Sequence, residues 1–337
     1  DYPNLDQQIK ERADVLWGDC DGKAILEHRY GNGRIVWGRS LREILSEKGL
    51  EPDFHYASDN EGTDLDFIHR RTDGAEIYFV SNRKPQSETV SAYFRTSGKA
   101  PEFWHPDSGR IVPQPVYEQT PGGVRVPLKL PPSGSLFVIF RKPVGGTHLI
   151  SADPTIEALT LSDGEIRFRA FENRTYRFTS SQGRKMEAEF ESIPAPEVIM
   201  GPWTVRFLEG PGTPESAQFQ ELESWTKHID PDIRSFSGTA RYESRVEIPS
   251  AWLGTGRSLY LDLGQLWAVG EVFLNGQSLG ILWKPPYRIE LTGAARPGEN
   301  ILEVEISNTW ANRLIGDARS APGHRHGRTN ITGSGTP

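Results

Sequence analysis

Apolar and polar residues alternate one by one in many short segments between residues 62 and 306, and this period of two is the strongest constraint on the fold. Successive side chains of a β-strand point to opposite faces, so such alternation is typical of a strand with one buried face. Gly and Pro, 34 and 25 in number, separate the segments and favour turns. The clearest strands are expected at residues 75–80, 90–94, 124–128, 135–140, 165–168, 175–178 and 185–188. The chain is therefore predicted to be mainly β, with its strands arranged in β-sandwiches.

A proline-rich step divides this β region. Pro194-Ala195-Pro196 is the best linker candidate, because proline restricts both itself and the residue before it. Further strands are expected beyond it at residues 203–207, 240–246, 258–263, 272–274 and 301–306, and Asn275-Gly276 is a strong hairpin signal. A chain of 337 residues is too long for one ordinary core. We expect a β-sandwich region at residues 61–196 and a second β domain at residues 197–337.

The first 60 residues show helical periodicity instead. Leu5, Ile9, Ala13 and Leu16 fall on one helical face, and Gly18 can end that helix. A second helix is marked by the capping box of Ser40 and Glu43 and ends near Gly49, with a turn at residues 31–33 between the two helices. One helix, a hairpin and a second helix do not make up a complete α/β domain. Residues 1–60 are predicted to be the tail of an α/β domain of the flavodoxin or amidotransferase kind.

Charge and cysteine content exclude several classes. A formal net charge of −7 disfavours nucleic acid and anionic membranes as partners, because both need a cationic surface. Cys20 is the single cysteine, so no intramolecular disulfide can form. The sequence has no apolar run long enough to span a membrane, and it begins Asp-Tyr-Pro without the pattern of a signal peptide.

No catalytic motif is recognisable. The sequence lacks a Gly-x-Ser-x-Gly elbow, a phosphate-binding glycine loop and a His-Glu-x-x-His pair. Glycosidases need two carboxylates whose separation is set by the fold, so acidic residues cannot be paired from sequence. His69, Arg70 and Arg71 beside Asp66 could form an acid–base group, but a salt-bridged strand end is the favoured interpretation.

An ordered series of motifs resembles a known family. Leu261-Asp262-Leu263-Gly264, the segments 271–276 and 283–286, and Pro297-Gly298-Glu299-Asn300 resemble the galactose-binding-like jelly roll of family 2-type glycoside hydrolases. The chain is also similar to the C-terminal region of glycoside hydrolase family 106, the α-L-rhamnosidases. This similarity covers Asn308-Thr309-Trp310-Ala311-Asn312-Arg313-Leu314-Ile315-Gly316-Asp317 and the upstream segments 67–70, 77–83 and 102–106.

The resemblance implies a bacterial, periplasmic or secreted protein, and a catalytic (β/α)8-type barrel that precedes these domains. That barrel has no counterpart in the sequence, so no catalytic residue is carried over. We interpret the partial α/β unit and the ending at Gly335-Thr336-Pro337 as truncation at both ends. The barrel of the parent enzyme is then one expected partner.

Carbohydrate binding remains as the expected function of this region. Sugars bind to flat aromatic faces and to side chains that exchange paired hydrogen bonds with hydroxyls. The residues that fit this requirement are Trp283, Tyr287, Trp310, Asn312 and Arg313. Trp283 and Trp310 could instead pack in the core, Asn312 and Arg313 could cap a loop, and Trp267 is expected to be core. The expected ligand is a rhamnose-containing plant glycan or a pectin side chain.

Metal binding has weak candidates. His324 and His326 would share one face of an extended segment, and Asp317 could approach them. A solvated loop is the favoured interpretation, because Arg319 and Arg325 would repel a cation, although the same basic cluster could pair with an acidic sugar. No cofactor is required, and a structural calcium is expected in preference to zinc.

Three functions therefore stand. The first is an accessory carbohydrate-binding region of an α-L-rhamnosidase-like hydrolase that lacks the catalytic barrel. The second is a stand-alone carbohydrate-binding protein. The third is an active glycosidase with a site between its β domains.

Overall fold

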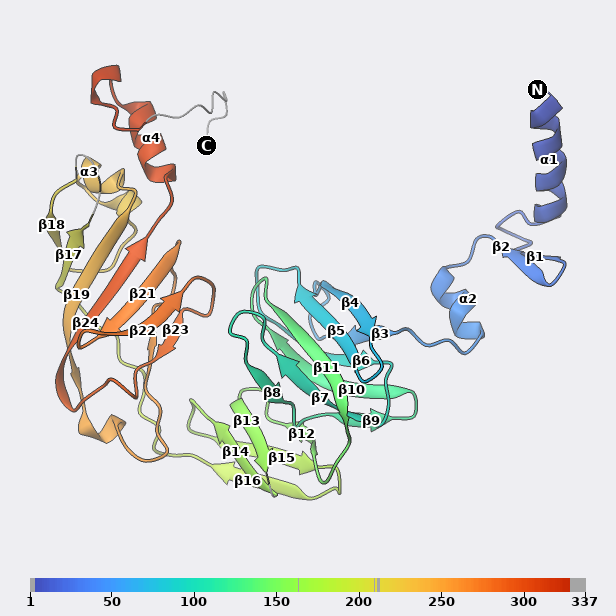
Figure 1. Ribbon diagram of the computed structural model, residues 1–337, viewed down its shortest axis with the longest axis horizontal. Coiled ribbons are helices and arrows are strands. Elements are labelled where there is room, and N and C mark those ends of the chain that lie inside the picture. Colours follow the sequence, from blue (N-terminus) through green and yellow to red (C-terminus); the bar gives the residue numbers. More distant parts are fainter. Residues whose placement is uncertain (1–3, 163, 209, 211–212, 328–337) are drawn as a thin grey trace. The chain divides into compact units, whose positions relative to one another are not determined.

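The computed structural model describes residues 4–162, 164–208, 210 and 213–327, and its main element is the antiparallel strand (Figure 1). The mainly β fold class predicted from the alternation is confirmed. Two compact units make up the chain: Asp1–Phe171 with Thr175–Glu189, and Glu172–Arg174 with Phe190–Pro337. The assignment of residues 1–60 to an α/β tail stays a prediction, and residues 328–337 of the expected last domain lie outside the described residues.

The N-terminal segment has the predicted helix–hairpin–helix order. Helix α1 spans Asn4–Trp17, strands β1 and β2 span Glu27–Tyr30 and Gly33–Val36, and helix α2 spans Leu41–Glu47. Gly18 takes a φ of 53°, and the Ser40–Glu43 capping box is formed. Neither helix buries a residue, since Ile9 and Leu41 are 58% and 70% exposed.

A β-sandwich follows in the first unit. One sheet has the order β3-β6-β10-β9 (Phe54–Ala57, Glu88–Phe94, Gly123–Leu130, Glu118–Thr120). The other has the order β4-β5-β11-β7-β8 (Leu65–Arg71, Glu76–Asn82, Ser135–Pro143, Lys99–Trp104, Ile111–Pro113). Both sheets send side chains such as Tyr78, Phe94 and Phe140 into one core. The alternation at residues 76–82 and 123–130 is thus the pattern of strands with one buried face.

Two smaller sheets complete this unit. Strands β12, β15 and β16 (Leu149–Ala152, Thr175–Ser180, Lys185–Glu189) form one, and β13 with β14 (Glu157–Ser162, Glu165–Arg169) forms the other. Tyr176 and Phe178 are the buried aromatics of their shared core, in which Phe168 and Met186 also pack.

The second unit contains a six-stranded antiparallel sheet. Its order is β18-β17-β19-β24-β21-β22 (Ser216–Phe219, Trp203–Phe207, Thr239–Ile248, Gly298–Ser307, Val269–Leu274, Gln277–Leu282). One face packs against the pair β20–β23 (Tyr260–Asp262, Arg288–Glu290) and the short helix α3 (Pro231–Arg234), burying Phe236, Val272 and Leu302. Asn275 and Gly276 have φ values of 53° and 79°, so the predicted β21–β22 hairpin turn is confirmed.

The sheet leads directly into the last described elements. Helix α4 spans Ala311–Arg319 and a 3₁₀ turn spans Pro322–His324. Asn308 fixes the connection, because its side chain accepts from the Gly238 backbone N–H and donates to the Phe236 carbonyl, both at 2.9 Å. The path of the chain from β24 to α4 is therefore set by hydrogen bonds to the segment that precedes β19.

Candidate functional site

Three strongly exposed tryptophans mark the second unit. Trp267, Trp283 and Trp310 are 87%, 58% and 70% exposed. A tryptophan side chain is usually buried in large part, so three such residues in one unit are unusual for a surface without a ligand.

Strand register places these tryptophans at one end of the six-stranded sheet. Trp267 lies just before β21, Trp283 just after β22 and Trp310 between β24 and α4. Val269 pairs with Ser307 and Gly270 pairs with Leu282, so the start of β21 meets the ends of β24 and β22. We call this end of the sheet, with Trp267, Trp283 and Trp310, the tryptophan edge.

The prediction that Trp267 lies in the core is wrong, because its side chain is exposed. Leu263 and Leu266, its apolar neighbours, turn inward: Leu263 packs against the core and Leu266 lies over Gly270. Ala268, the residue that follows, has a φ of 147°, which L residues rarely adopt. The backbone thus turns between Leu266 and Val269 in a way that leaves the indole outside.

The loop after β22 holds two of the predicted sugar ligands. Trp283 is exposed, and the Lys284 ammonium lies 5.7 Å from the centre of its ring. Tyr287 is half-buried, and its carbonyl accepts a hydrogen bond of 2.8 Å from the Leu263 backbone N–H. The loop is therefore tied to the segment that leads to Trp267. Exposure of Trp283 and Trp310 disfavours the core-packing alternative for both.

Asn312 and Arg313 lie in the first turn of α4. Asn312 is half-buried, whereas Arg313 is only 5% exposed and its backbone N–H donates to Ser237 Oγ at 2.9 Å. An arginine so deeply buried has little surface for direct contact with a ligand. Of the five predicted ligands, the structure brings Trp283, Tyr287, Trp310 and Asn312 to accessible or half-accessible positions, and their role in binding stays a prediction.

The Asp317 carboxylate binds backbone groups of the same chain. Burial raises the pKa of this carboxyl, but hydrogen bonds from the backbone N–H groups of His326 and Gly327 outweigh it and hold the pKa below its ordinary value. His324 and His326 are exposed. Within the described residues, no three His, Cys, Asp or Glu side chains lie together as a metal site. The geometry favours the solvated-loop interpretation of the histidines, and a structural calcium stays a prediction.

The buried carboxylates of the first unit also bind neighbouring side chains. Glu102, 2% exposed, lies 2.7 Å from Arg141 Nε and 2.6 Å from Lys142 Nζ. Glu88, also 2% exposed, accepts hydrogen bonds from Thr63 and Asn60. Each is neutralised or fully bonded by its neighbours, which suits a structural role better than proton transfer.

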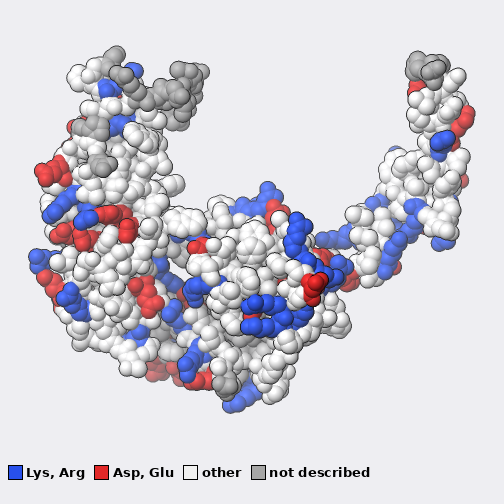
Figure 2. Space-filling view, viewed as in Figure 1, with Lys and Arg blue, Asp and Glu red and all other residues white. Residues whose placement is uncertain are grey.

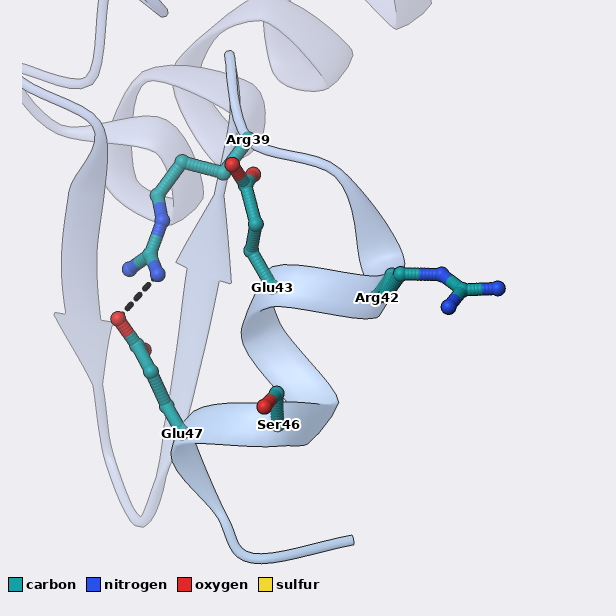
Figure 3. Close-up of a pocket in the computed structure, with 5 residues that line it drawn as sticks. All are labelled: Arg39, Arg42, Glu43, Ser46 and Glu47. Carbon is teal, nitrogen blue, oxygen red and sulfur yellow. Dashed lines mark hydrogen bonds and ion pairs between the residues drawn. The ribbon is translucent and has the colours of Figure 1, made fainter. Parts of the chain in front are cut away.

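A shallow hollow of about 450 Å³ lies along helix α2 (Figure 3). It is lined by the charged or polar residues Arg39, Arg42, Glu43, Ser46 and Glu47. Arg39 pairs with Glu47, Glu43 is held by the capping box, and Arg42 points away from the others. Without an aromatic face, this hollow is a poor sugar site.

Three comparisons relate the chain to known proteins. Residues 3–119 match the model of glycoside hydrolase family 106, α-L-rhamnosidase. The solved rhamnosidase from Novosphingobium sp. PP1Y is 28% identical, with a TM-score of 0.62 over 93% of this chain and 26% of its own. A protein of Formosa agariphila named "Putative beta-glucuronidase" is 23% identical over 94% of this chain and 42% of its own length. The chain thus spans less than half of each of these relatives.

The β-sandwich architecture and these relatives define the chain as a relative of glycoside hydrolases. Within that class, the predicted resemblance to glycoside hydrolase family 106, the α-L-rhamnosidases, is confirmed. In the part of the chain that the structure describes, no helix is both long and apolar enough for a transmembrane span.

Proposed function

We propose that this chain is a carbohydrate-binding accessory region of an α-L-rhamnosidase-type glycoside hydrolase, and that it does not hydrolyse glycosides by itself. Its last domain would be a galactose-binding-like jelly roll that presents the tryptophan edge to the glycan. The expected setting is the periplasm or the exterior of a bacterium, and the expected partner within the enzyme is the catalytic barrel.

The observation that carries the proposal is the tryptophan edge. Indole faces pack against the C–H faces of sugar rings and keep their N–H free for hydroxyls, which is why binding sites combine aromatic and polar groups. Trp267, Trp283 and Trp310 come from three separate segments that strand pairing brings together. Hydrogen bonds hold those segments: the Asn308 side chain bonds to the backbone of Gly238 and Phe236, and the Leu263 backbone N–H donates to the Tyr287 carbonyl.

Isothermal titration of the full chain with a rhamnose-containing oligosaccharide tests binding. We expect Trp283→Ala and Trp310→Ala each to weaken binding about tenfold or more, which corresponds to the loss of about 1.4 kcal/mol of contact. Trp37→Ala is the matched control, because Trp37 is also exposed, at 52%, but lies in the N-terminal segment. Absence of heat with every rhamnose-containing ligand, or equal losses in all three variants, would contradict the proposal.

Release of nitrophenol from an aryl α-L-rhamnoside tests the non-catalytic part of the proposal. We expect no turnover by the purified chain, since the buried carboxylates Glu88 and Glu102 are bonded to neighbours. Turnover that disappears on exchange of one carboxylate for an amide would instead establish the chain as an active glycosidase.

A further inference from the structure

The outer face of the six-stranded sheet carries an excess of carboxylates. Core-facing residues of β19, β24 and β21 have even numbers, so their odd-numbered neighbours face outward. Next to the tryptophan edge, the charged outward residues of the central strands are Arg241, Glu243, Glu271, Glu303 and Glu305, whereas Arg245, Glu247 and Glu299 lie further along β19 and β24. Figure 2 shows acidic side chains gathered over these strands, with basic ones beside them.

Like charges lie directly opposite each other on this face. Glu243 pairs in register with Glu303, and Glu271 pairs with Glu305. Cross-strand pairs of like charge destabilise a sheet, so two such pairs side by side are not explained by folding alone.

Arginine neutralises this surface only in part. Arg241 Nε lies 2.8 Å from Glu305 Oε1, and its Nη1 lies 3.3 Å from Glu303 Oε1. Arg206, exposed on β17, is the next residue along the same row. Two guanidinium groups thus face four carboxylates, and the surface stays negative. We call the surface formed by Arg206, Arg241, Glu243, Glu271, Glu303 and Glu305 the carboxylate face.

The carboxylate face begins where the tryptophan edge ends. Along β21, Val269 is the last residue of the edge and Glu271 is the next outward position. Glu271 pairs with Ile281, which is 59% exposed and lies two residues before Trp283. A glycan whose first sugar rests on the tryptophans would therefore place a neighbouring sugar over Glu271, Glu305 and Arg241.

These groups can bind hydroxyls, and their net negative charge repels another anion. A carboxylate accepts hydrogen bonds from hydroxyl pairs, and a guanidinium donates them. Glu303 and Glu305 side chains are 19% and 20% exposed, which limits screening of their charge by solvent. We propose that the surface formed by the tryptophan edge and the carboxylate face selects neutral glycans and rejects those that carry uronic acids. This inference rests on the proposed carbohydrate binding.

Two oligosaccharides that differ only in charge test the selection. The probes are an oligosaccharide of alternating rhamnose and galacturonic acid and the same oligosaccharide with its carboxyl groups reduced to alcohols. We expect the full chain to bind the reduced, neutral form about tenfold or more tightly at low ionic strength, and we expect the difference to shrink in high salt. Titration calorimetry or ligand-observed NMR measures both affinities.

Charge variants identify the source of the selection. The double variant Glu271→Gln with Glu303→Gln should bring the two affinities within about threefold of each other, because the amides keep the shape and lose the charge. Glu299→Gln is the matched control, since Glu299 is an exposed carboxylate at the far end of the same strand β24, paired with Arg245 at 2.7 Å. This control should keep the full selectivity.

The outcomes separate the two proposals. Equal or stronger binding of the uronate would overturn the selection of neutral glycans and leave carbohydrate binding intact. Selectivity that survives in the double variant would assign it to other residues and overturn the role of this face. Failure to bind either oligosaccharide, or any neutral rhamnose-containing ligand, would reject the proposed function and this inference with it.

Discussion

Nδ1 of His69 lies 2.8 Å from Oδ2 of Asp53, and this contact joins the two sheets of the first β-sandwich. His69 belongs to β4, whereas Asp53 immediately precedes β3 in the opposite sheet. The other ring nitrogen lies 2.8 Å from Glu76, and the ring stacks on Tyr78 at 3.9 Å. The sequence predicted that His69 lies in a salt-bridged strand end beside Asp66. The salt-bridged strand end is confirmed, but the partners of His69 are Asp53 and Glu76, whereas Asp66 lies near Arg83.

The first prediction concerns this contact. In a double-mutant cycle of Asp53→Ala and His69→Ala, we expect a coupling free energy of about 1 kcal/mol, because the two side chains are partly buried and directly bonded. Urea denaturation of the four proteins gives the free energies of unfolding. Asp66→Ala, which removes an exposed partner of Arg83, should change stability by about 0.5 kcal/mol or less. A coupling of zero would mean that the contact does not hold the sheets together.

A second prediction rests on Tyr242 and Trp225 in the core of the second unit. The Trp225 indole N–H donates to the Tyr242 hydroxyl, and burial raises the pKa of Tyr242 to about 12. Tyr242→Phe should destabilise the unit by about 1–2 kcal/mol, because a buried N–H loses its acceptor. The raised pKa contributes stability that is complete below pH 10 and is lost as the pH rises towards about 12. The difference in ultraviolet absorbance between the chain and its Tyr242→Phe variant isolates this hydroxyl, which should ionise near pH 12; ionisation at the ordinary value would refute the burial.

The third prediction concerns the C-terminal segment held by Asp317. Asp317→Asn should lower hydrogen-exchange protection at His326 and Gly327 about tenfold, because the charged acceptor of both N–H groups is lost. The depressed pKa means that this stabilisation is present at neutral pH and is lost as the pH falls below the ordinary value of 3.8. Asp262→Asn, which affects a turn at Gly264, should leave the segment unchanged. Unchanged exchange in Asp317→Asn would show that the carboxylate does not anchor it.

A fourth prediction tests the backbone beside Trp267. Ala268→Gly should stabilise the second unit by about 1 kcal/mol. The backbone conformation of Ala268 costs an L residue about 1–3 kcal/mol, which glycine relieves, whereas the extra chain entropy of glycine costs less than about 1 kcal/mol. Ala240→Gly is the opposite control, because Ala240 is a fully buried strand residue and should lose stability. Thermal unfolding measures both. A lower midpoint for Ala268→Gly would mean that the alanine is not strained.

Sequence alone was sufficient for the local elements. Strands at residues 203–207 and 301–306, the Asn275-Gly276 turn and the Ser40–Glu43 capping box all lie where the pattern predicts them. These features depend on alternation, on positive φ and on hydrogen bonds within a few residues, and each is written into a short stretch of chain.

Tertiary structure alone decided the candidate site. Trp267 was expected in the core from its apolar neighbours, yet the turn at Ala268 leaves it exposed. Arg313 was a candidate sugar ligand, yet it is buried in α4. The placement of Trp267, Trp283 and Trp310 at one end of the sheet, and the pairing of Glu271 with Glu305, follow from strand register between segments that are far apart in the sequence. Register is set by the packing of the whole core and by the turns together, so no single stretch of sequence contains it.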